Sequence, residues 1–266
     1  MDLITSKANP KIKQIRALRQ HKARQAAGLL VVEGIRPVGE AIAAQAQVES
    51  LLYAPDLLTS EFARRLIAEQ AARGIPTYPT TPEVFNSLAD KDNPQGILAV
   101  VVQPYTSLES LNPGNFSWGV AAIASQDPGN VGAILRSASA FGFRQVIALK
   151  GTAALWSTKV LRAGMGAHWG LQLVEGASLE QLDVLTVPLL VTSSHRGSYL
   201  HQALLKEELP MPCAWALGHE GQGVCAELEA RAGGHVRIAQ PGGEESLNVA
   251  SAAAICLHAS ATAHLV

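Results

Sequence analysis

The chain has 266 residues, which is enough for one large domain or for two ordinary domains that each bury a core. Hydrophobic residues make up 48% of it and charged residues 16%, a composition that excludes a disordered chain. The net charge of −1 is too small to indicate any class of partner.

The first 24 residues differ from the rest in charge. They contain seven Lys and Arg residues and one acid, so this segment carries +6 and the rest of the chain must carry −7. Asn9 followed by Pro10 predicts the start of a helix, in which Ile12, Ile15 and Leu18 form an apolar stripe. The basic side chains on its other faces fit either a contact with a polyanion or an ordinary solvated helix face.

The remainder of the first half alternates short apolar runs with helical patterns. Strands are predicted for residues 29–33, 50–54, 76–80 and 96–102, and a helix for residues 60–73. This alternation predicts a small α/β domain over residues 1–105. Residues 103–117 contain Pro104, Pro113, Gly114 and several small polar residues without a period, and they predict a linker that we place at residues 106–117.

The second half, residues 118–266, repeats the alternation. Its apolar strand candidates are residues 119–125, 145–150, 188–193, 213–218 and 235–239, and its helix candidates are residues 130–142, 157–164, 224–232 and 247 to the end. Continuous apolar strands between helices predict a buried and largely parallel sheet. In such a sheet, ligands bind beyond the carboxyl ends of the strands.

Three of these strand ends lead into unusual loops. They are SQDPGNVGAILRSA (125–138), WALGHEGQGV (215–224) and RIAQPGGEESLNVASAAA (237–254). Taken singly, each has an ordinary interpretation. Asn130 reads as a helix N-cap, Arg136 as a surface charge and Ser246 as another N-cap, while the glycines permit tight turns.

Taken together, the three loops resemble the motifs of the SpoU (TrmH-type) RNA ribose methyltransferases. The patterns N-x-G-x-x-x-R, L-G-x-E-G-x-G and I-x-x-x-G-x-x-x-S-L-N-V occur in order, and STKVLRAGMGAHW (157–169) is similar to a fourth stretch of the family. TSKANPKIKQIRAL, LLVVEGIRPVGEA and NPQGILAVV resemble the substrate-binding domain that precedes the catalytic domain in many members. His219 and Gln240 depart from the usual residues at their positions.

The resemblance implies a two-domain α/β fold. The N-terminal domain would be a small, L30e-like RNA-substrate-binding domain, and the C-terminal domain an α/β trefoil-knot (SPOUT) methyltransferase domain. The implied cofactor is S-adenosyl-L-methionine, and the implied reaction is methylation of a ribose 2′-hydroxyl in RNA. The two-domain layout favours ribosomal RNA, with transfer RNA as the alternative.

The resemblance also implies roles for individual residues. The implied catalytic residues are Asn130, Arg136, Glu220, Ser246 and Asn248. The implied cofactor-binding residues are Gly218, Gly223, Ile238, Leu247, Ser246 and Asn248. The implied RNA-binding residues are Lys7, Lys11, Lys13, Arg16, Arg19 and Arg36. Arg136 is the family's candidate base, but a guanidinium is costly to deprotonate, so we favour a role in holding phosphate and orienting the hydroxyl.

Two other interpretations are open at this point. A protein of the same fold that binds RNA without catalysis would keep these motifs only in part. A hydrolase or dehydrogenase on a doubly wound sheet would need a G-x-S-x-G elbow or a first-strand G-x-G-x-x-G, and the sequence has neither.

The remaining expectations concern surroundings and assembly. The three cysteines have no metal-binding spacing, so no metal is expected, and an odd count without a signal peptide fits a reducing cytoplasm with buried thiols. The C-terminal stretch is too polar to span a membrane. It suits a helix in a homodimer interface, as in the family, because it carries no charged residue after Glu245.

Overall fold

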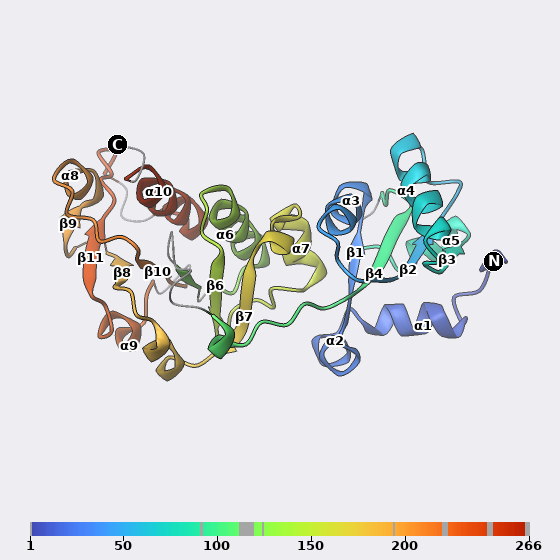
Figure 1. The fold of residues 1–266 in the computed structure, drawn as a ribbon, viewed down its shortest axis with the longest axis horizontal. Coiled ribbons are helices and arrows are strands. Elements are labelled where there is room, and N and C mark those ends of the chain that lie inside the picture. Colours follow the sequence, from blue (N-terminus) through green and yellow to red (C-terminus); the bar gives the residue numbers. More distant parts are fainter. Residues whose placement is uncertain are drawn as a thin grey trace. The chain divides into compact units, whose positions relative to one another are not determined.

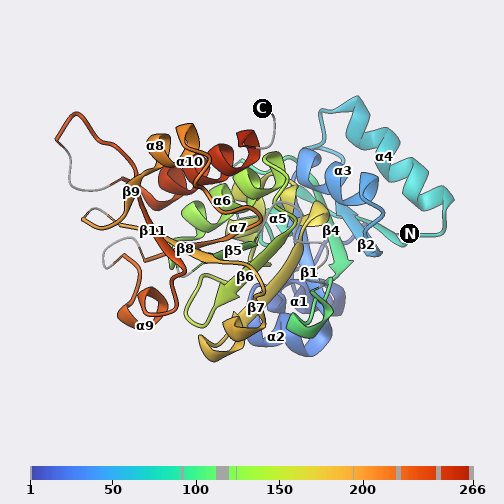
Figure 2. The ribbon, with the colours of Figure 1, turned by 60° about the vertical axis from the view of Figure 1, so that its left-hand side comes forward.

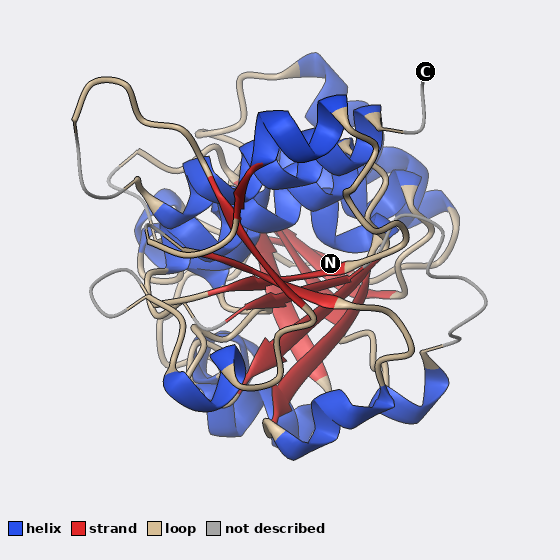
Figure 3. Cartoon of the chain, turned by 90° about the vertical axis from the view of Figure 1, so that its left-hand side faces the viewer, coloured by secondary structure: helices blue, strands red, loops and turns tan. Residues whose placement is uncertain are grey.

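A computed structural model describes residues 2–90, 93–111, 120–123, 125–193, 195–219, 223–243 and 247–263, with the backbone alone for 120–123. The other residues are drawn in grey (Figure 3). The chain forms two compact units. The N-terminal unit comprises Met1–Pro104 and Trp156–Trp169, and the C-terminal unit comprises Tyr105–Leu155 and Gly170–Val266.

The N-terminal unit is built on a four-stranded sheet in the order β1-β4-β2-β3 (Figure 1). Its strands are β1 (Leu29–Glu33), β2 (Val48–Tyr53), β3 (Thr77–Pro79) and β4 (Ile97–Val102). The strand β4 runs antiparallel to both neighbours, whereas β2 and β3 are parallel. All four strands lie where the sequence predicts them.

The helices of this unit are α1 (Pro10–Ala17), α2 (His21–Ala27), α3 (Ile35–Ala43), α4 (Glu61–Ala72), α5 (Pro82–Asn86) and α7 (Thr158–Gly164). The start of α1 is as predicted, because the side chain of Asn9 accepts a hydrogen bond from Lys11 N and Pro10 occupies the first turn. Ile12, Ile15 and Leu18 are buried in the unit's core. The apolar stripe therefore anchors the basic helix.

The helix α7 belongs to the N-terminal unit although it lies between two strands of the other unit's sheet in the chain. It contacts β1, and Arg162 lies 3.8 Å from Asp90 Oδ2. The hydroxyl of Thr158 donates to the same carboxylate at 3.4 Å. A prediction that divides the sequence into two consecutive domains does not anticipate that Trp156–Trp169, from the second half, belongs to the N-terminal unit.

The C-terminal unit contains a seven-stranded parallel sheet in the order β7-β6-β5-β10-β8-β11-β9. Its strands are β5 (Val120–Ile123), β6 (Gln145–Leu149), β7 (Gln172–Ala177), β8 (Leu189–Thr192), β9 (Ser198–Tyr199), β10 (Ala214–Leu217) and β11 (Gly234–Arg237). The predicted parallel sheet and its five predicted strands are confirmed. The two strands that prediction missed, β7 and β9, lie at the sheet edges.

The helices of this unit are α6 (Pro128–Ala140), α8 (Leu200–Leu205), α9 (Ala226–Glu229) and α10 (Val249–Thr262). Short 3₁₀ turns are η1 (Leu108–Ser110), η3 (Ala167–Gly170), which crosses into this unit, and η4 (Glu180–Val184). The helices α6, α10 and α8 lie in a row on one side of the sheet (Figure 2). Inside this layer the indole of Trp215 donates to Ser260 Oγ at 2.9 Å, which ties β10 to α10.

Two details of the sequence interpretation change. Leu108 and Leu111, within the predicted linker, are buried in the core of the C-terminal unit. The expectation of buried thiols is right for Cys213 and Cys256 but wrong for Cys225, which is exposed just before α9. Among the described residues, no helix is long and apolar enough to cross a membrane.

Candidate active site

The three motif loops leave the same edge of the parallel sheet. They follow β5, β10 and β11, and these strands, with β8, are consecutive neighbours that run in one direction. The carboxyl ends of parallel strands meet at one edge, where ligands bind in open α/β sheets. The fold therefore gathers segments that are more than a hundred residues apart in the sequence.

The first loop ends in a cap that the sequence interpretation assigned to the wrong residue. Asp127, not Asn130, is the N-cap of α6, and its Oδ1 accepts a hydrogen bond from Asn130 N at 2.7 Å. Pro128 occupies the first turn, so the sequence Asp-Pro carried the signal for this earlier start. Because the cap is Asp127, the side chain of Asn130 can contact another part of the chain.

That other part is the third loop. Asn248 is the N-cap of α10, and its Oδ1 accepts from Ala250 N and Ser251 N at 2.9 and 3.2 Å. Its Nδ2 donates to Asn130 Oδ1 at 2.9 Å. One amide thus fixes the start of α10 and joins the first motif to the third, across 118 residues of sequence. Asn130 and Asn248 are therefore brought together as the resemblance implies.

The second loop leaves no room for a side chain at Gly218. A Cβ at this position would lie 2.3 Å from the backbone of Gly223. The approach is close because His219 and Gly223 exchange two backbone hydrogen bonds of 2.8 Å. Gly223 itself has a positive φ of 69°. Both glycines are thus required by the loop's own backbone.

The remaining predicted residues of this unit are distributed around these loops. Arg136 is exposed on α6, six residues beyond Asn130, which places it about 9 Å further along the helix axis. Leu247 is 40% exposed just before the cap of α10. Ile238 follows β11 and is half-buried. Glu220 and Ser246 lie outside the described residues.

Among the described residues of the third loop (237–254), one buried polar atom lacks a partner within the described part of the chain. It is Oε1 of Gln240, two residues after Ile238. A buried acceptor without a hydrogen bond is unfavourable, and a ligand with an N–H or O–H group would satisfy it. The sequence interpretation treated Gln240 only as a departure from the family, and its burial was the missing signal.

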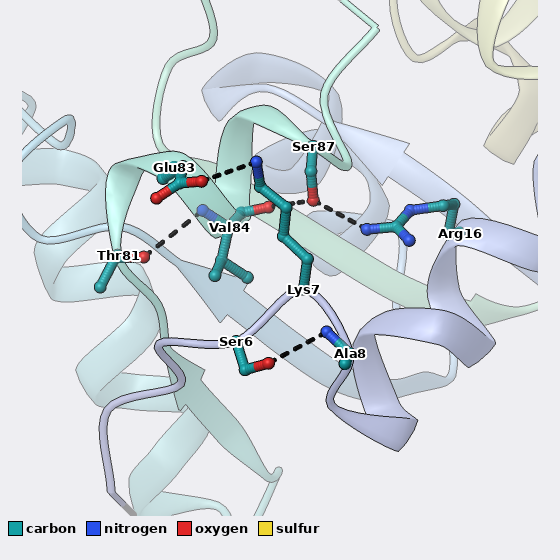
Figure 4. A network of polar contacts seen from close by, with 8 residues as sticks. All are labelled: Ser6, Lys7, Ala8, Arg16, Thr81, Glu83, Val84 and Ser87. Atoms are coloured by element: carbon teal, nitrogen blue, oxygen red, sulfur yellow. Dashed lines mark hydrogen bonds and ion pairs between the residues drawn. The ribbon is translucent and has the colours of Figure 1, made fainter.

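In the N-terminal unit, most of the predicted RNA-binding cations already have partners. Lys7 pairs with Glu83 at 2.7 Å, Arg16 donates to Ser87 Oγ at 3.0 Å, and Arg19 donates to the carbonyl of Leu88 (Figure 4 shows the first two). These contacts attach the basic segment to α5 and the residues after it. These basic side chains therefore stabilise the fold of the N-terminal unit, in addition to any contact that they make with a partner.

Two further cations are also paired. Lys11 donates to both carboxylate oxygens of Glu49 at 2.9 and 3.0 Å. Burial alone would raise the pKa of Glu49, but hydrogen bonds from Ser50 and Lys11 outweigh it and lower the pKa. Arg36 lies 3.7 Å from Glu40 on an exposed face of α3.

Lys13 is the exception among the predicted RNA-binding residues. It is exposed, and within the described part of the chain it makes no hydrogen bond or ion pair, as is also true of Lys22. Arg24 shows the opposite extreme, because it is buried and donates to the carbonyls of Leu18 and Arg19. Of the seven basic residues, Lys13 and Lys22 are the ones open to a polyanion.

The described residues hold no group of three His, Cys, Asp or Glu side chains that could bind a metal ion. The cysteines do not form a nucleophilic centre in the described residues either. Burial raises the pKa of the Cys213 thiol to about 12, although a hydrogen bond with Ser260 lowers it slightly. The described groups that the three loops offer to a ligand are therefore side-chain amides, the guanidinium of Arg136 and the closely packed backbone at Gly218 and Gly223.

Comparison with known proteins agrees with this arrangement. Residues 119–258 match the model of the SpoU rRNA methylase family, and residues 9–99 match the MRM3-like substrate-binding domain. The chain is 30% identical to the 23S rRNA (guanosine(2553)-2′-O)-methyltransferase RlmP of Bacillus subtilis over 97% of its own length and 98% of the relative's.

Two further similarities cover much or all of the chain. It is 30% identical to the 23S rRNA (guanosine-2′-O-)-methyltransferase RlmB of Bordetella pertussis over 73% of the chain and 80% of the relative. It superposes with a TM-score of 0.83 and 29% identity on an AdoMet-bound rRNA methyltransferase from Sinorhizobium meliloti, covering 100% of this chain and 98% of the other. The chain is a two-domain member of the SpoU rRNA methylase family.

Proposed function

We propose that the protein transfers a methyl group from S-adenosyl-L-methionine to a ribose 2′-hydroxyl in ribosomal RNA. The observation that carries the proposal is the hydrogen bond between Asn248 and Asn130, because it unites the first and third family motifs at the carboxyl edge of the sheet. The relatives named above are ribosomal RNA 2′-O-methyltransferases, and one neighbour was solved with AdoMet bound. Their activity supports the same activity here.

The residues of the second and third loops fit the cofactor. The closed backbone at Gly218 and Gly223 offers peptide groups without side chains in the way, and Ile238 and Leu247 add backbone from the third loop. The unpartnered Oε1 of Gln240 suits the amino groups of S-adenosylmethionine. When bound, the cofactor supplies an activated methyl group on a sulfonium.

The chain itself must then align the hydroxyl and manage its proton. A guanidinium stays protonated, so Arg136 holds the phosphate next to the target ribose and polarises the hydroxyl. Asn130 and Asn248 keep the two motifs in register through their hydrogen bond. We assign Glu220 and Ser246 to the same site because they belong to the second and third motifs.

We assign substrate capture to residues 1–105 and methyl transfer to residues 118–266, connected by residues 106–117, of which Leu108 and Leu111 pack into the core of the C-terminal unit. The match to a substrate-binding domain supports the first assignment. Lys13 is the predicted RNA-binding residue with the least engaged charge, and Lys7, Lys11, Arg16, Arg19 and Arg36 would have to exchange existing partners for phosphate. Ribosomal RNA is the first candidate substrate, and transfer RNA the second.

Three further features belong to this proposal: a trefoil knot in the C-terminal unit, a homodimer and a cytoplasmic location. The knot is supported by membership of the SpoU family, for which the resemblance implies this fold. The dimer is supported by the uncharged, partly exposed surface of α10. The location is supported by the relatives named above, which are bacterial and act on ribosomal RNA, a molecule that bacteria hold in the cytoplasm.

The test is transfer of a tritiated methyl group from S-adenosylmethionine to RNA isolated from a strain that lacks the gene. We expect incorporation into ribosomal RNA of this strain, at one ribose, and little into RNA from the parent strain, where the site is already methylated. Incorporation into transfer RNA alone would select the alternative substrate. If the protein binds both S-adenosylmethionine and RNA but transfers no methyl group, it is a catalytically silent RNA-binding protein and the proposal is overturned.

A further inference from the structure

Planar side chains form a partly exposed cluster at the carboxyl ends of the edge strand β9 and its neighbour β11. Tyr199 and Arg237 are cross-strand partners in the parallel pair, and the guanidinium carbon of Arg237 lies 4.1 Å from the centroid of the Tyr199 ring. The imidazole of His201 stacks with the same ring at a centroid distance of 5.6 Å and an interplanar angle of 27°. The Tyr199 ring thus contacts both a guanidinium and an imidazole.

The cluster is held in place by its own backbone. Arg237 Nε donates to the carbonyl of Gly197 at 2.9 Å, and a Cβ on Gly197 would lie 1.9 Å from the carbonyl oxygen of His235. The hydroxyl of Ser193 accepts from the backbone N–H groups of His195 and Arg196, which fixes the turn before β9. These contacts mean that little ordering is needed when a ligand binds.

The two segments that carry the cluster contain Arg196, Lys206 and Arg237 as their charged residues. Arg196 and His201 are exposed, and Tyr199 and Arg237 are half-buried. Neither residues 184–206 nor residues 232–243 contain an Asp or a Glu, although the chain outside its first 24 residues carries a net −7. A polyanion that approaches the C-terminal unit would therefore be attracted to this area.

The cluster is also close in sequence and topology to the proposed active site. Arg237 is the last residue of β11, and the third motif loop starts at the next residue, Ile238. Because β9 and β11 are parallel members of the same sheet, Tyr199 lies at the edge from which all three motif loops leave. A ligand that spans this edge reaches both.

We propose that Tyr199, Arg237 and His201 form a stacking platform for an unpaired base of the RNA substrate, with Arg196 available for a neighbouring phosphate. Proteins recognise single-stranded RNA by stacking its bases on aromatic rings and guanidinium planes, and a layered tyrosine and arginine offer both. The inference rests on the proposed function, in that it identifies the RNA as one with an unpaired segment beside the methylated ribose. It makes Tyr199 and Arg237 positioning residues of that reaction.

The probes are a labelled twelve-nucleotide oligoadenylate and the matching oligomer of abasic ribose phosphates, which carries the same charge without bases. We expect the full-length protein to bind the oligoadenylate roughly 5- to 100-fold more tightly than the abasic oligomer, as stacking of one base predicts. The ratio of the affinity for the oligoadenylate to that for the abasic oligomer should fall close to one in Tyr199→Ala. It should keep its original value in Tyr199→Phe, which retains the ring. Arg237→Lys, which keeps the charge but loses the plane, should lower the ratio in part.

A role limited to bracing the edge strand gives a different result. Tyr199→Ala would then leave the ratio of the two affinities at its value in the unmodified protein, and that outcome, or a ratio of one in the unmodified protein itself, would overturn the platform. If Tyr199→Ala does not fold, His201→Ala and Arg237→Lys provide the same comparison. The assay needs no methyl transfer, so failure of the platform and failure of the proposed function are read separately.

Discussion

At the scale of single residues, Arg136 is the side chain on which the proposed chemistry depends most. It is exposed on α6 and, within the described residues, makes no hydrogen bond or ion pair, so its removal should not disturb the fold. We expect Arg136→Ala to lower the rate of methyl transfer by about 100-fold or more, as loss of a preorganised charge does, with cofactor affinity in calorimetry largely unchanged. Full activity of this variant would contradict the assignment.

Replacement by lysine separates charge from shape at the same position. Arg136→Lys keeps a cation but loses the planar fork that binds phosphate in two places. We expect it to recover much of the RNA affinity that Arg136→Ala loses, but little of the turnover rate. Equal recovery of both would indicate that a point charge is sufficient and would argue against an orienting role.

Asn248 has two tasks that substitution can separate. Asn248→Ala removes both the cap of α10 and the bond to Asn130, so it should lower stability by about 1 kcal/mol, or the melting temperature by about 2–4 °C. Asn248→Ser keeps a capping hydroxyl but is too short to reach Asn130. It should therefore melt near the parent protein and still lose methyl transfer. An active Asn248→Ser variant would show that the contact with Asn130 is dispensable.

The cysteines predict a dependence on pH. Burial raises the pKa of Cys213 from 9.0 to about 12, and burial, with the charge of Cys213, also raises the pKa of Cys256. Both thiols hold their protons in the folded state, so their contribution to stability is complete below pH 9 and is lost as the pH rises from 9 towards 12.

Alkylation of the native protein at pH 8 should label Cys225 alone, which mass spectrometry would show, and labelling of Cys213 would contradict its burial.

At the scale of elements, the basic segment that contains α1 and α2 illustrates what sequence can and cannot reveal. The count of +6 was visible, but the partners of Lys7, Lys11 and Arg16 come from residues 38 to 76 positions away along the chain. Such pairings depend on tertiary structure and have no local signature. Charge that looks available in the sequence is therefore largely engaged in the fold.

This leads to a prediction for RNA binding. Lys13 and Lys22 are the open cations of the segment, so replacing both with Gln should flatten the plot of log affinity against log salt by up to about 2 units. The control is Lys7→Gln, whose charge is already balanced by Glu83 and whose loss should change the slope less. Filter binding across a salt series measures both, and parallel lines for all proteins would favour the solvated-face interpretation.

The parallel sheet and the motif loops were more predictable than the charges. Apolar runs such as residues 145–150 and 188–193 are continuous and local, so they became β6 and β8 as expected. The two-residue strand β9 carries no pattern of its own and exists because β11 lies beside it. The cap of α6 was misassigned because Asn130 is also a good capping residue, and the choice of Asp127 depends on where Pro128 starts the helix.

At the scale of the whole molecule, the position of α7 makes the two units discontinuous in sequence. The segment Trp156–Trp169 belongs to the N-terminal unit but is tethered at both ends to the C-terminal unit's sheet. Trp156 is buried in it and lies against His168 and Trp169. Neither unit is therefore formed by one continuous stretch of the chain. A cut within the predicted linker would leave Trp156–Trp169, which belongs to the N-terminal unit, on the C-terminal fragment.

The last expectation concerns assembly. The buried face of α10 is occupied by residues such as Ala253, Cys256 and Leu257, while Leu247 and Ile255 are 40% and 41% exposed. Ile255 lies on α10 and Leu247 lies one residue before its N-cap, and no charged residue follows Glu245. An uncharged helix surface with an exposed isoleucine suits contact with another surface, and a second copy of the chain is the partner that the family suggests.

We therefore expect the protein to sediment as a dimer at micromolar concentration. Ile255→Glu would place a charge in the interface without touching the buried face, so it should weaken the dimer by about tenfold or more and shift the population towards monomer. Phe62→Glu, at a half-exposed position on α4 in the other unit, is the matched control and should leave the dimer intact. If the parent protein sediments as a stable monomer, or if both variants dissociate equally, α10 is not the interface.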